Sequence, residues 1–242
     1  MGHLIPSGDE RRLLGRFYWA TFLAEFAHWA MPFQVLLIIR YLGQPQLGIL
    51  LGIEQFVALS LEVPTGAWAD RFGRKRCVLI GHVLAALGWL AIPPATLLDE
   101  HVRLIGMGAA FGLLGAGAAL VSGALEAWVV DNLRFQGRKD LILRFFGRER
   151  SLAATGGIAA DLAALVALGA LVDVRLFWIV SGIGELIALA ILWGAPEHAP
   201  TGQGLDESGE HVFSSAAAGH DQEEDPEDSE EDGEPTGIRA PR

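Results

Sequence analysis

Six long apolar stretches leave this chain few possible folds. The hydrocarbon core of a bilayer is about 30 Å thick, so a helix that crosses it needs about 20 mostly apolar residues. Backbone polar groups in the bilayer must be satisfied within the protein, which favours helices. The sequence therefore predicts an all-α integral membrane protein with six spanning helices. The predicted spans are 13–39, 46–67, 77–98, 102–130, 151–172 and 174–193.

The acidic balance of the chain comes from its C-terminal end. The formal net charge is −11, and residues 196–242 contain fourteen acidic but only two basic residues. A segment so rich in charge, Gly, Ser and Pro buries too little apolar surface to offset the entropy lost on ordering. We expect a disordered, acidic cytoplasmic tail at 196–242, after a cytoplasmic N-terminus (1–12) and a six-helix domain (13–195).

Basic residues predict the orientation. With the N-terminus in the cytoplasm, thirteen Lys and Arg residues fall in cytoplasmic segments and three fall in outer turns. Cytoplasmic loops carry this excess in membrane proteins. The sequence thus predicts a multi-pass protein of the cell membrane, in contact with the lipid bilayer, with both termini cytoplasmic. Residues 132–150 are too charged to span and predict a short amphipathic segment at the cytoplasmic surface.

The connection between the second and third predicted spans carries a motif, GAWADRFGRK, at residues 66–75. It resembles the loop motif G-x-x-x-D-R-x-G-R-K/R of the major facilitator superfamily. By residue type alone, the first glycine would allow close helix approach and the second would adopt a positive φ. The aspartate, at a helix boundary, would accept hydrogen bonds or pair with the second arginine. The six matching positions are Gly66, Asp70, Arg71, Gly73, Arg74 and Lys75.

The flanking sequence extends this resemblance. Residues 62–66 are similar to an E-x-P-T-G sequence in one branch of the superfamily, and residues 122–131 are similar to the end of its fourth helix. The chain departs from the drug exporters of the family, because Gly108 stands where their fourth helix carries an arginine. It also has six predicted helices, whereas family members have twelve.

The resemblance implies a fold and a function. The fold would be two three-helix inverted repeats that form one six-helix half, with substrate bound between two halves that alternate in access. The implied function is transport of a small molecule, with an ion-coupled exporter as one form. The partner would be a second six-helix half, either a second copy or a separate chain. Two alternatives stay open: a truncated remnant that does not transport, and a membrane scaffold or regulator that acts through its acidic tail.

Ionisable residues at membrane depth are the candidate functional residues. A charge inside a span costs about 2.5–3.5 kcal/mol on insertion scales and usually faces a cavity or a partner. Glu25 and His28 share one helix face and would hold or pass a proton, with an interhelical hydrogen bond as the alternative. Glu126 and Asp161 are further candidates for a cavity or for ion coupling.

Structural roles are expected for other polar residues. A tie to the basic loop is favoured over substrate contact for Glu126, and also for Asp131 and Glu62. We expect Glu185 to pair within the bundle and His82 to be packed. The small residues at 106–123 predict close helix packing.

Several classes of function find no support in the sequence. Basic residues occur only in short loops, so no nucleic-acid partner is predicted. The chain has no G-x-x-x-x-G-K-[ST] pattern and no nucleophile–base constellation, so we expect neither ATP-driven transport nor an enzyme. Its single cysteine, Cys77, allows no intramolecular disulfide. No metal site and no cofactor are expected.

Overall fold

The computed structural model describes residues 8–27, 35, 38–169, 173 and 175–197. All of them belong to a compact unit that extends over Met1–Thr201, apart from a second unit at Gly202–Arg242. His28 and, except for its first two residues, the predicted tail at 196–242 lie outside the described residues.

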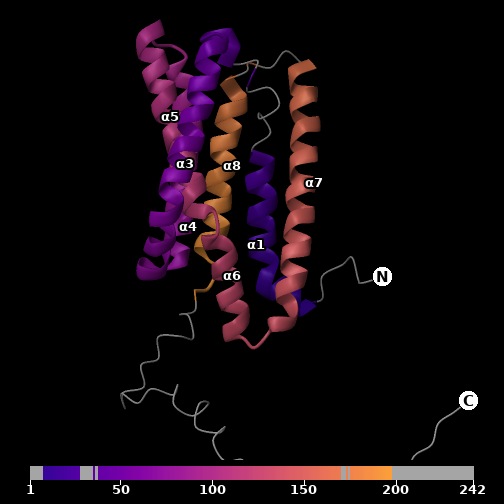
Figure 1. The fold of residues 1–242 in the computed structure, drawn as a ribbon. Coiled ribbons are helices and arrows are strands. Elements are labelled where there is room, and N and C mark those ends of the chain that lie inside the picture. Colours follow the sequence, from indigo (N-terminus) through magenta and orange to yellow (C-terminus); the bar gives the residue numbers. More distant parts are fainter. Residues whose placement is uncertain (1–7, 28–34, 36–37, 170–172, 174, 198–242) are drawn as a thin grey trace, which may run out of the picture. The chain divides into compact units, whose positions relative to one another are not determined.

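Helices make up all the regular structure of the described residues, and no strand occurs among them (Figure 1). The predicted all-α class is therefore confirmed. Seven α-helices and one short 3₁₀ helix are described. In chain order they are α1 (Gly8–Ala27), α3 (Gln44–Phe72), α4 (Arg74–Ala95), α5 (Glu100–Val121), α6 (Ala124–Phe135), η1 (Lys139–Leu141), α7 (Ile142–Gly169) and α8 (Arg175–Trp193).

Five helical segments are long and apolar enough to cross a membrane, which indicates an integral membrane protein. They correspond to the second to sixth predicted spans. The first predicted span, 13–39, is described only in part, by α1 and a few residues beyond it. The five segments are Gln44–Phe72, Arg74–Ala95, Glu100–Phe135, Lys139–Ala167 and Arg175–Trp193.

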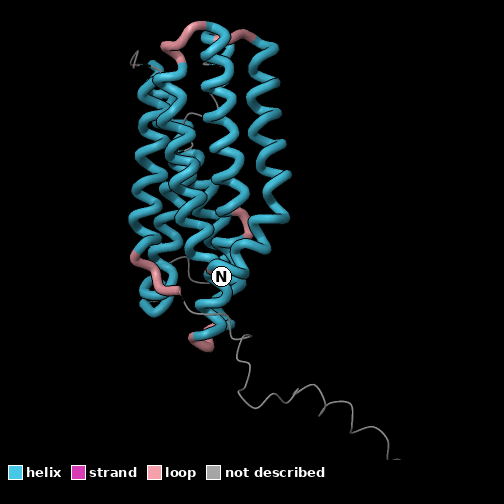
Figure 2. Tube along the Cα trace, turned by 90° about the vertical axis from the view of Figure 1, so that its left-hand side faces the viewer, coloured by secondary structure: helices cyan, strands magenta, loops and turns pink. Residues whose placement is uncertain are grey.

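The described helices run alongside one another (Figure 2), and short loops connect α3 to α4 and α4 to α5. At the start of α4, Lys75 Nζ donates to the carbonyl of Ala195, just after the end of α8, at 2.6 Å. Near the start of α7, Arg148 pairs with Glu10 at the start of α1. These four helix ends lie at the lower end in Figure 1, so the basic segments predicted to be cytoplasmic gather at one end.

Small residues allow α3, α4 and α5 to approach closely. A Cβ atom at Gly117 on α5 would lie 2.8 Å from the carbonyl oxygen of Gly81 on α4. A Cβ atom at Gly115 would lie 2.3 Å from the carbonyl oxygen of Glu54 on α3. Neither position has room for a side chain, in agreement with the packing role expected for residues 106–123.

Three expected features differ in the structure. A Cβ atom at Gly66 would meet no atom within 4 Å, because this face of α3 is exposed and no described helix packs against it. The predicted span 102–130 is divided between α5 and α6, where Gly123 adopts a φ of 70° that favours glycine. Helix α7 begins at Ile142 and so includes half of the segment predicted to be separate at 132–150.

Two apolar clusters fill the interior. One contains Phe17 and Trp128, whose rings meet edge to face with centroids 4.9 Å apart. The other contains Trp89, Phe111 and Trp178. The cavity described below has lining residues from both clusters, so the two clusters hold its walls in place.

We predict that Gly117→Ala destabilises the protein by about 1–3 kcal/mol, because the new methyl group meets backbone atoms that cannot rotate away. The midpoint of thermal unfolding in mild detergent, followed by helical circular dichroism, measures this loss. The matched control is Gly112→Ala on the same helix, where the nearest atom to a Cβ is 3.9 Å away. Equal midpoints for the two variants would contradict the close packing of α4 and α5.

Candidate functional site

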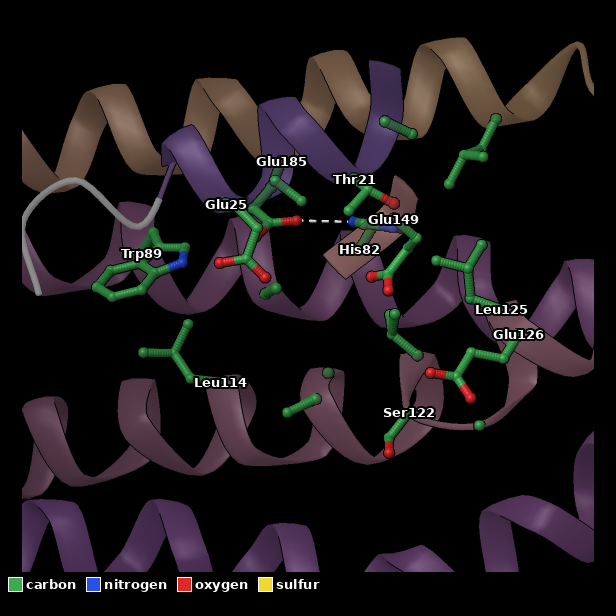
Figure 3. Close-up of a pocket in the computed structure, with 18 of the residues that line it drawn as sticks. Thr21, Glu25, His82, Trp89, Leu114, Ser122, Leu125, Glu126, Glu149 and Glu185 are labelled. Carbon is green, nitrogen blue, oxygen red and sulfur yellow. Dashed lines mark hydrogen bonds and ion pairs between the residues drawn. The ribbon is translucent and has the colours of Figure 1, made fainter. Parts of the chain in front are cut away.

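A cavity of about 420 Å³ lies among the helices (Figure 3). Its lining residues come from α1, α3, α4, α5, α6, α7 and α8, so every α-helix in the described part of the chain contributes. Its volume is in the range of sites that take small molecules. Because the lining comes from segments distant in sequence, the cavity exists only in the packed bundle.

Carboxylates dominate the polar lining of this cavity. Arg150 is the only Lys or Arg among the described residues of the lining. Its side chain is 81% exposed, and its Nε lies 3.9 Å from Glu149. The lining therefore has an excess of acidic over basic groups. The five lining carboxylates are Glu25 on α1, Glu54 on α3, Glu126 on α6, Glu149 on α7 and Glu185 on α8.

A buried pair joins α4 to α8 at the cavity wall. The Nδ1 atom of His82 lies 2.7 Å from Oε2 of Glu185, and the two residues are only 4% and 3% exposed. The expected pairing of Glu185 within the bundle is thus present. The Nε2 atom of His82 has no hydrogen-bond partner among the described residues. With a neutral imidazole, Nδ1–H donates to Glu185 and Nε2 keeps a lone pair.

Two of the predicted candidates meet at the cavity. The half-buried carboxylates of Glu25 and Glu126 both line it, and neither has a hydrogen bond or ion pair within the described residues. Both lie close enough to Glu149 for their charges to repel its carboxylate. The arrangement favours a cation or a proton between these side chains. The tie to the basic loop favoured for Glu126 is not among its contacts.

Asp161 lies elsewhere, in the C-terminal half of α7. It is exposed and does not line the cavity. Nearby residues of the helix are apolar and exposed to a similar extent: Ile158, Leu162 and Leu165 are each about 60% exposed. A carboxylate at this depth requires a partner or water rather than lipid. The role predicted for Asp161 in a cavity is not supported by this position.

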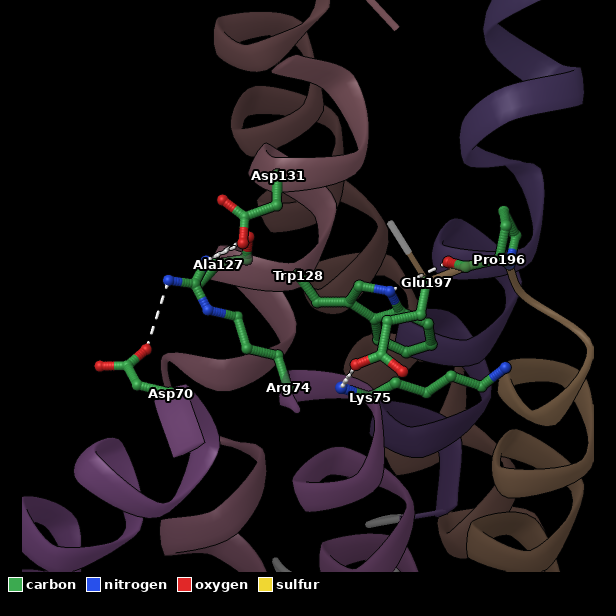
Figure 4. Close-up of polar contacts among 8 residues, drawn as sticks. All are labelled: Asp70, Arg74, Lys75, Ala127, Trp128, Asp131, Pro196 and Glu197. Carbon is green, nitrogen blue, oxygen red and sulfur yellow. Dashed lines mark hydrogen bonds and ion pairs between the residues drawn. The ribbon is translucent and has the colours of Figure 1, made fainter. Parts of the chain in front are cut away.

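The loop motif forms a polar network around Arg74 (Figure 4). Its Nη1 donates to the carbonyl oxygen of Ala127 at 2.9 Å and to the carboxylate of Asp131, both on α6. Its Nη2 lies 3.5 Å from Asp70 on α3. Arg74 therefore connects three helices, and Asp131 is placed as the predicted tie requires.

Lys75 extends the network to the chain that follows α8. Its Nζ lies 5.8 Å from the centre of the Trp128 ring, a distance suited to a cation–π contact. The Trp128 indole donates to the carbonyl of Pro196 at 3.0 Å, and the Lys75 backbone N–H donates to Glu197 at 3.2 Å. Residues 195–197 are thus held against α4 and α6.

The remaining motif residues have simpler positions. Gly73 adopts a φ of 100° between α3 and α4, which confirms the predicted positive φ. Arg71 is exposed, and its guanidinium lies 5.4 Å from the centre of the Phe72 ring. Glu62 is also exposed, and its side chain forms no ion pair with the described residues. The tie predicted for Glu62 is not among these contacts.

Some polar contacts could not be found from the sequence. Glu10 is fully buried, where it accepts a hydrogen bond from the Tyr18 hydroxyl at 3.0 Å and pairs with Arg148 on α7. Arg148 and Glu149 lie in a segment whose charge predicted a surface position. The only signal for Glu10 is its spacing of eight residues from Tyr18, which places both on one helix face.

Comparison with known proteins does not assign this chain to a family. The chain matches no family model, and the searches of curated proteins and of solved structures find no similar protein. The described residues also contain no group of His, Cys, Asp and Glu arranged to hold a metal ion. The function is therefore argued from the geometry of the cavity and the network.

We predict that Arg74→Ala lowers the free energy of unfolding by about 1–3 kcal/mol, because it removes charge-assisted hydrogen bonds to α6 and leaves Asp131 without its cation. Thermal unfolding in detergent measures the change. The control is Arg76→Ala, which removes an exposed arginine from the same loop. A loss as large for Arg76→Ala would show that loop charge matters and the network does not.

Proposed function

We propose that this chain is one six-helix half of a secondary transporter of the major facilitator type, and that it moves a small molecule across the cell membrane. The central cavity is the observation that carries this proposal. It has the volume of a small-molecule site, and every described α-helix contributes to its walls. Glu25 and Glu126 give it ionisable groups suited to substrate binding or proton coupling.

The six-helix architecture is part of the proposal. Five described segments can span a membrane, and α1 supplies the beginning of a sixth span. In this arrangement α5 and α6 form one span that is broken at Gly123. The gathering of basic residues at one end supports a cytoplasmic position for that end and for both termini. The acidic residues at 196–242 then form a disordered cytoplasmic tail.

The second half is proposed to be a second copy of this chain. In the apolar 18-residue stretch of α3 only 6% is buried, and in that of α7 only 17%, whereas 56% of the corresponding stretch of α4 is buried. Both sparsely buried helices carry exposed polar residues near mid-span, Gln55 on α3 and Asp161 on α7. Across an interface between copies, the Gln55 amide can donate to the Asp161 carboxylate, which removes the cost of a charge in lipid.

We predict that the purified chain is a dimer in mild detergent and that Asp161→Leu shifts it towards monomer. Light scattering combined with size exclusion measures the protein mass without its detergent. The control is Glu100→Leu, which removes an exposed carboxylate at the first residue of α5. A wild-type chain that is monomeric at every concentration would contradict the proposed second copy.

Access to the cavity tests transport without a known substrate. Ala118 lines the cavity and is exposed, so Ala118→Cys in a Cys77→Ala background supplies one reactive thiol there. A membrane-impermeant maleimide is added to vesicles of either orientation. Alternating access requires that the maleimide labels the thiol from both sides of the membrane. Because Asp161→Leu is expected to separate the two copies, this variant should be labelled from one side only. Labelling from one side only would favour a remnant or scaffold over a transporter.

A further inference from the structure

The charges around the cavity point to the sign of its ligand. Glu25 and Glu126 both lie close enough to repel the Glu149 carboxylate, and Arg150 is the only Lys or Arg among the described residues that line this space. The Arg150 side chain is mostly exposed, so it offsets only part of this charge. A cation placed between the carboxylates would relieve the repulsion, whereas an anion would increase it.

Two buried polar atoms face the cavity without a partner. His82 is 4% exposed and Thr21 is 7% exposed, and both line the cavity. The Nε2 atom of His82 and the Oγ1 atom of Thr21 have no hydrogen-bond partner among the described residues. Leaving such buried atoms without a hydrogen bond is unfavourable, so they mark positions that a ligand can satisfy.

These atoms also indicate the hydrogen-bond character of the ligand. The carboxylates accept hydrogen bonds, and the Thr21 hydroxyl can accept one as well. When its imidazole is neutral, His82 donates from Nδ1 to Glu185 and can accept a hydrogen bond at Nε2. A ligand that matches this set must donate N–H bonds and carry positive charge.

Most of the remaining wall is apolar. Trp89, Leu114, Leu125 and Leu192 are large apolar side chains of this lining. An aromatic ring offers contact area and attraction to a nearby cation. Because the described residues contain no metal-binding group, a bare metal ion fits this lining poorly. An organic body with a charged amine fits both kinds of wall.

We propose that the central cavity binds a primary organic ammonium ion with an aromatic or aliphatic body, whose N–H groups meet Glu25, Glu126 and the Nε2 atom of His82. This assignment names the substrate class of the proposed transporter and rests on that function for its physiological meaning. The binding itself depends only on the cavity, so it can be tested without transport.

The first test measures the charge preference of the cavity. The thiol introduced by Ala118→Cys in the Cys77→Ala background is reacted with 2-aminoethyl methanethiosulfonate or with its 2-sulfonatoethyl analogue. The ratio of the reaction rate of the ammonium reagent to that of the sulfonate reagent should be about tenfold or more higher for the introduced thiol than for free 2-mercaptoethanol. Glu25→Gln and Glu126→Gln keep the side-chain shape and should each reduce this preference severalfold. Glu100→Gln, at an exposed helix end outside the cavity, should leave it unchanged.

The second test uses ligands that share one skeleton. Tryptamine, tryptophol and indole-3-propionate carry a positive, neutral and negative end on the same indole ring. Tryptamine should slow the reaction of the introduced thiol at concentrations at least about tenfold lower than tryptophol. Indole-3-propionate should not protect it. Glu25→Gln and Glu126→Gln should each weaken protection by tryptamine about tenfold.

The outcomes separate this inference from the proposed function. Equal reagent preference in the cavity and in solution overturns it, and so does a preference that neither glutamine variant changes. Equal protection by the three indoles, or none by tryptamine, overturns it too.

Labelling from both sides without a cation preference would support the transporter function but contradict this substrate class. Cation preference with one-sided labelling would leave an ammonium-binding membrane protein that does not transport. Size exclusion and circular dichroism confirm that each variant is folded.

Discussion

The cost of placing charge in an apolar interior governs this structure. An ionised group removed from water must find a partner or a polar space. His82 and Glu185 meet this need as a pair 2.7 Å apart that fastens α4 to α8. Glu25 and Glu126 meet it differently, because they face a shared cavity. The same rule thus produces both a structural tie and a candidate binding site.

The sequence predicts the elements of the fold well, because spanning helices depend on local hydropathy. Five spans appear in the described residues, and Gly73 has its predicted positive φ. Element boundaries were less accurate. Hydropathy runs continuously through 102–130, so it could not reveal that Gly123 breaks the helix there. The start of α7 at Ile142 was also not predicted, because the charged residues at 132–150 indicated a separate surface segment. A helix can in fact extend from the bilayer into water.

Side-chain partners could be predicted less well than helices. The position of Asp131 follows from a matched motif, whereas the pairing of Glu10 with Arg148 joins residues 138 positions apart. No local pattern specifies such a contact, because it depends on which faces of α1 and α7 meet. The cavity has the same origin. Glu149 was missed because its neighbours are charged, and Asp161 was grouped with cavity residues because hydropathy gives depth but not direction.

Helix α6 connects the network to the cavity. Glu126 projects into the cavity from this helix, while Ala127 and Asp131 hold Arg74 on its other side. The break at Gly123 separates α6 from α5, so the path of α5 does not fix the direction of α6. A helix is stiff over two turns because each backbone hydrogen bond spans four residues. The contacts that Arg74 and Trp128 make at the end of the bundle therefore help to set the position of the Glu126 carboxylate.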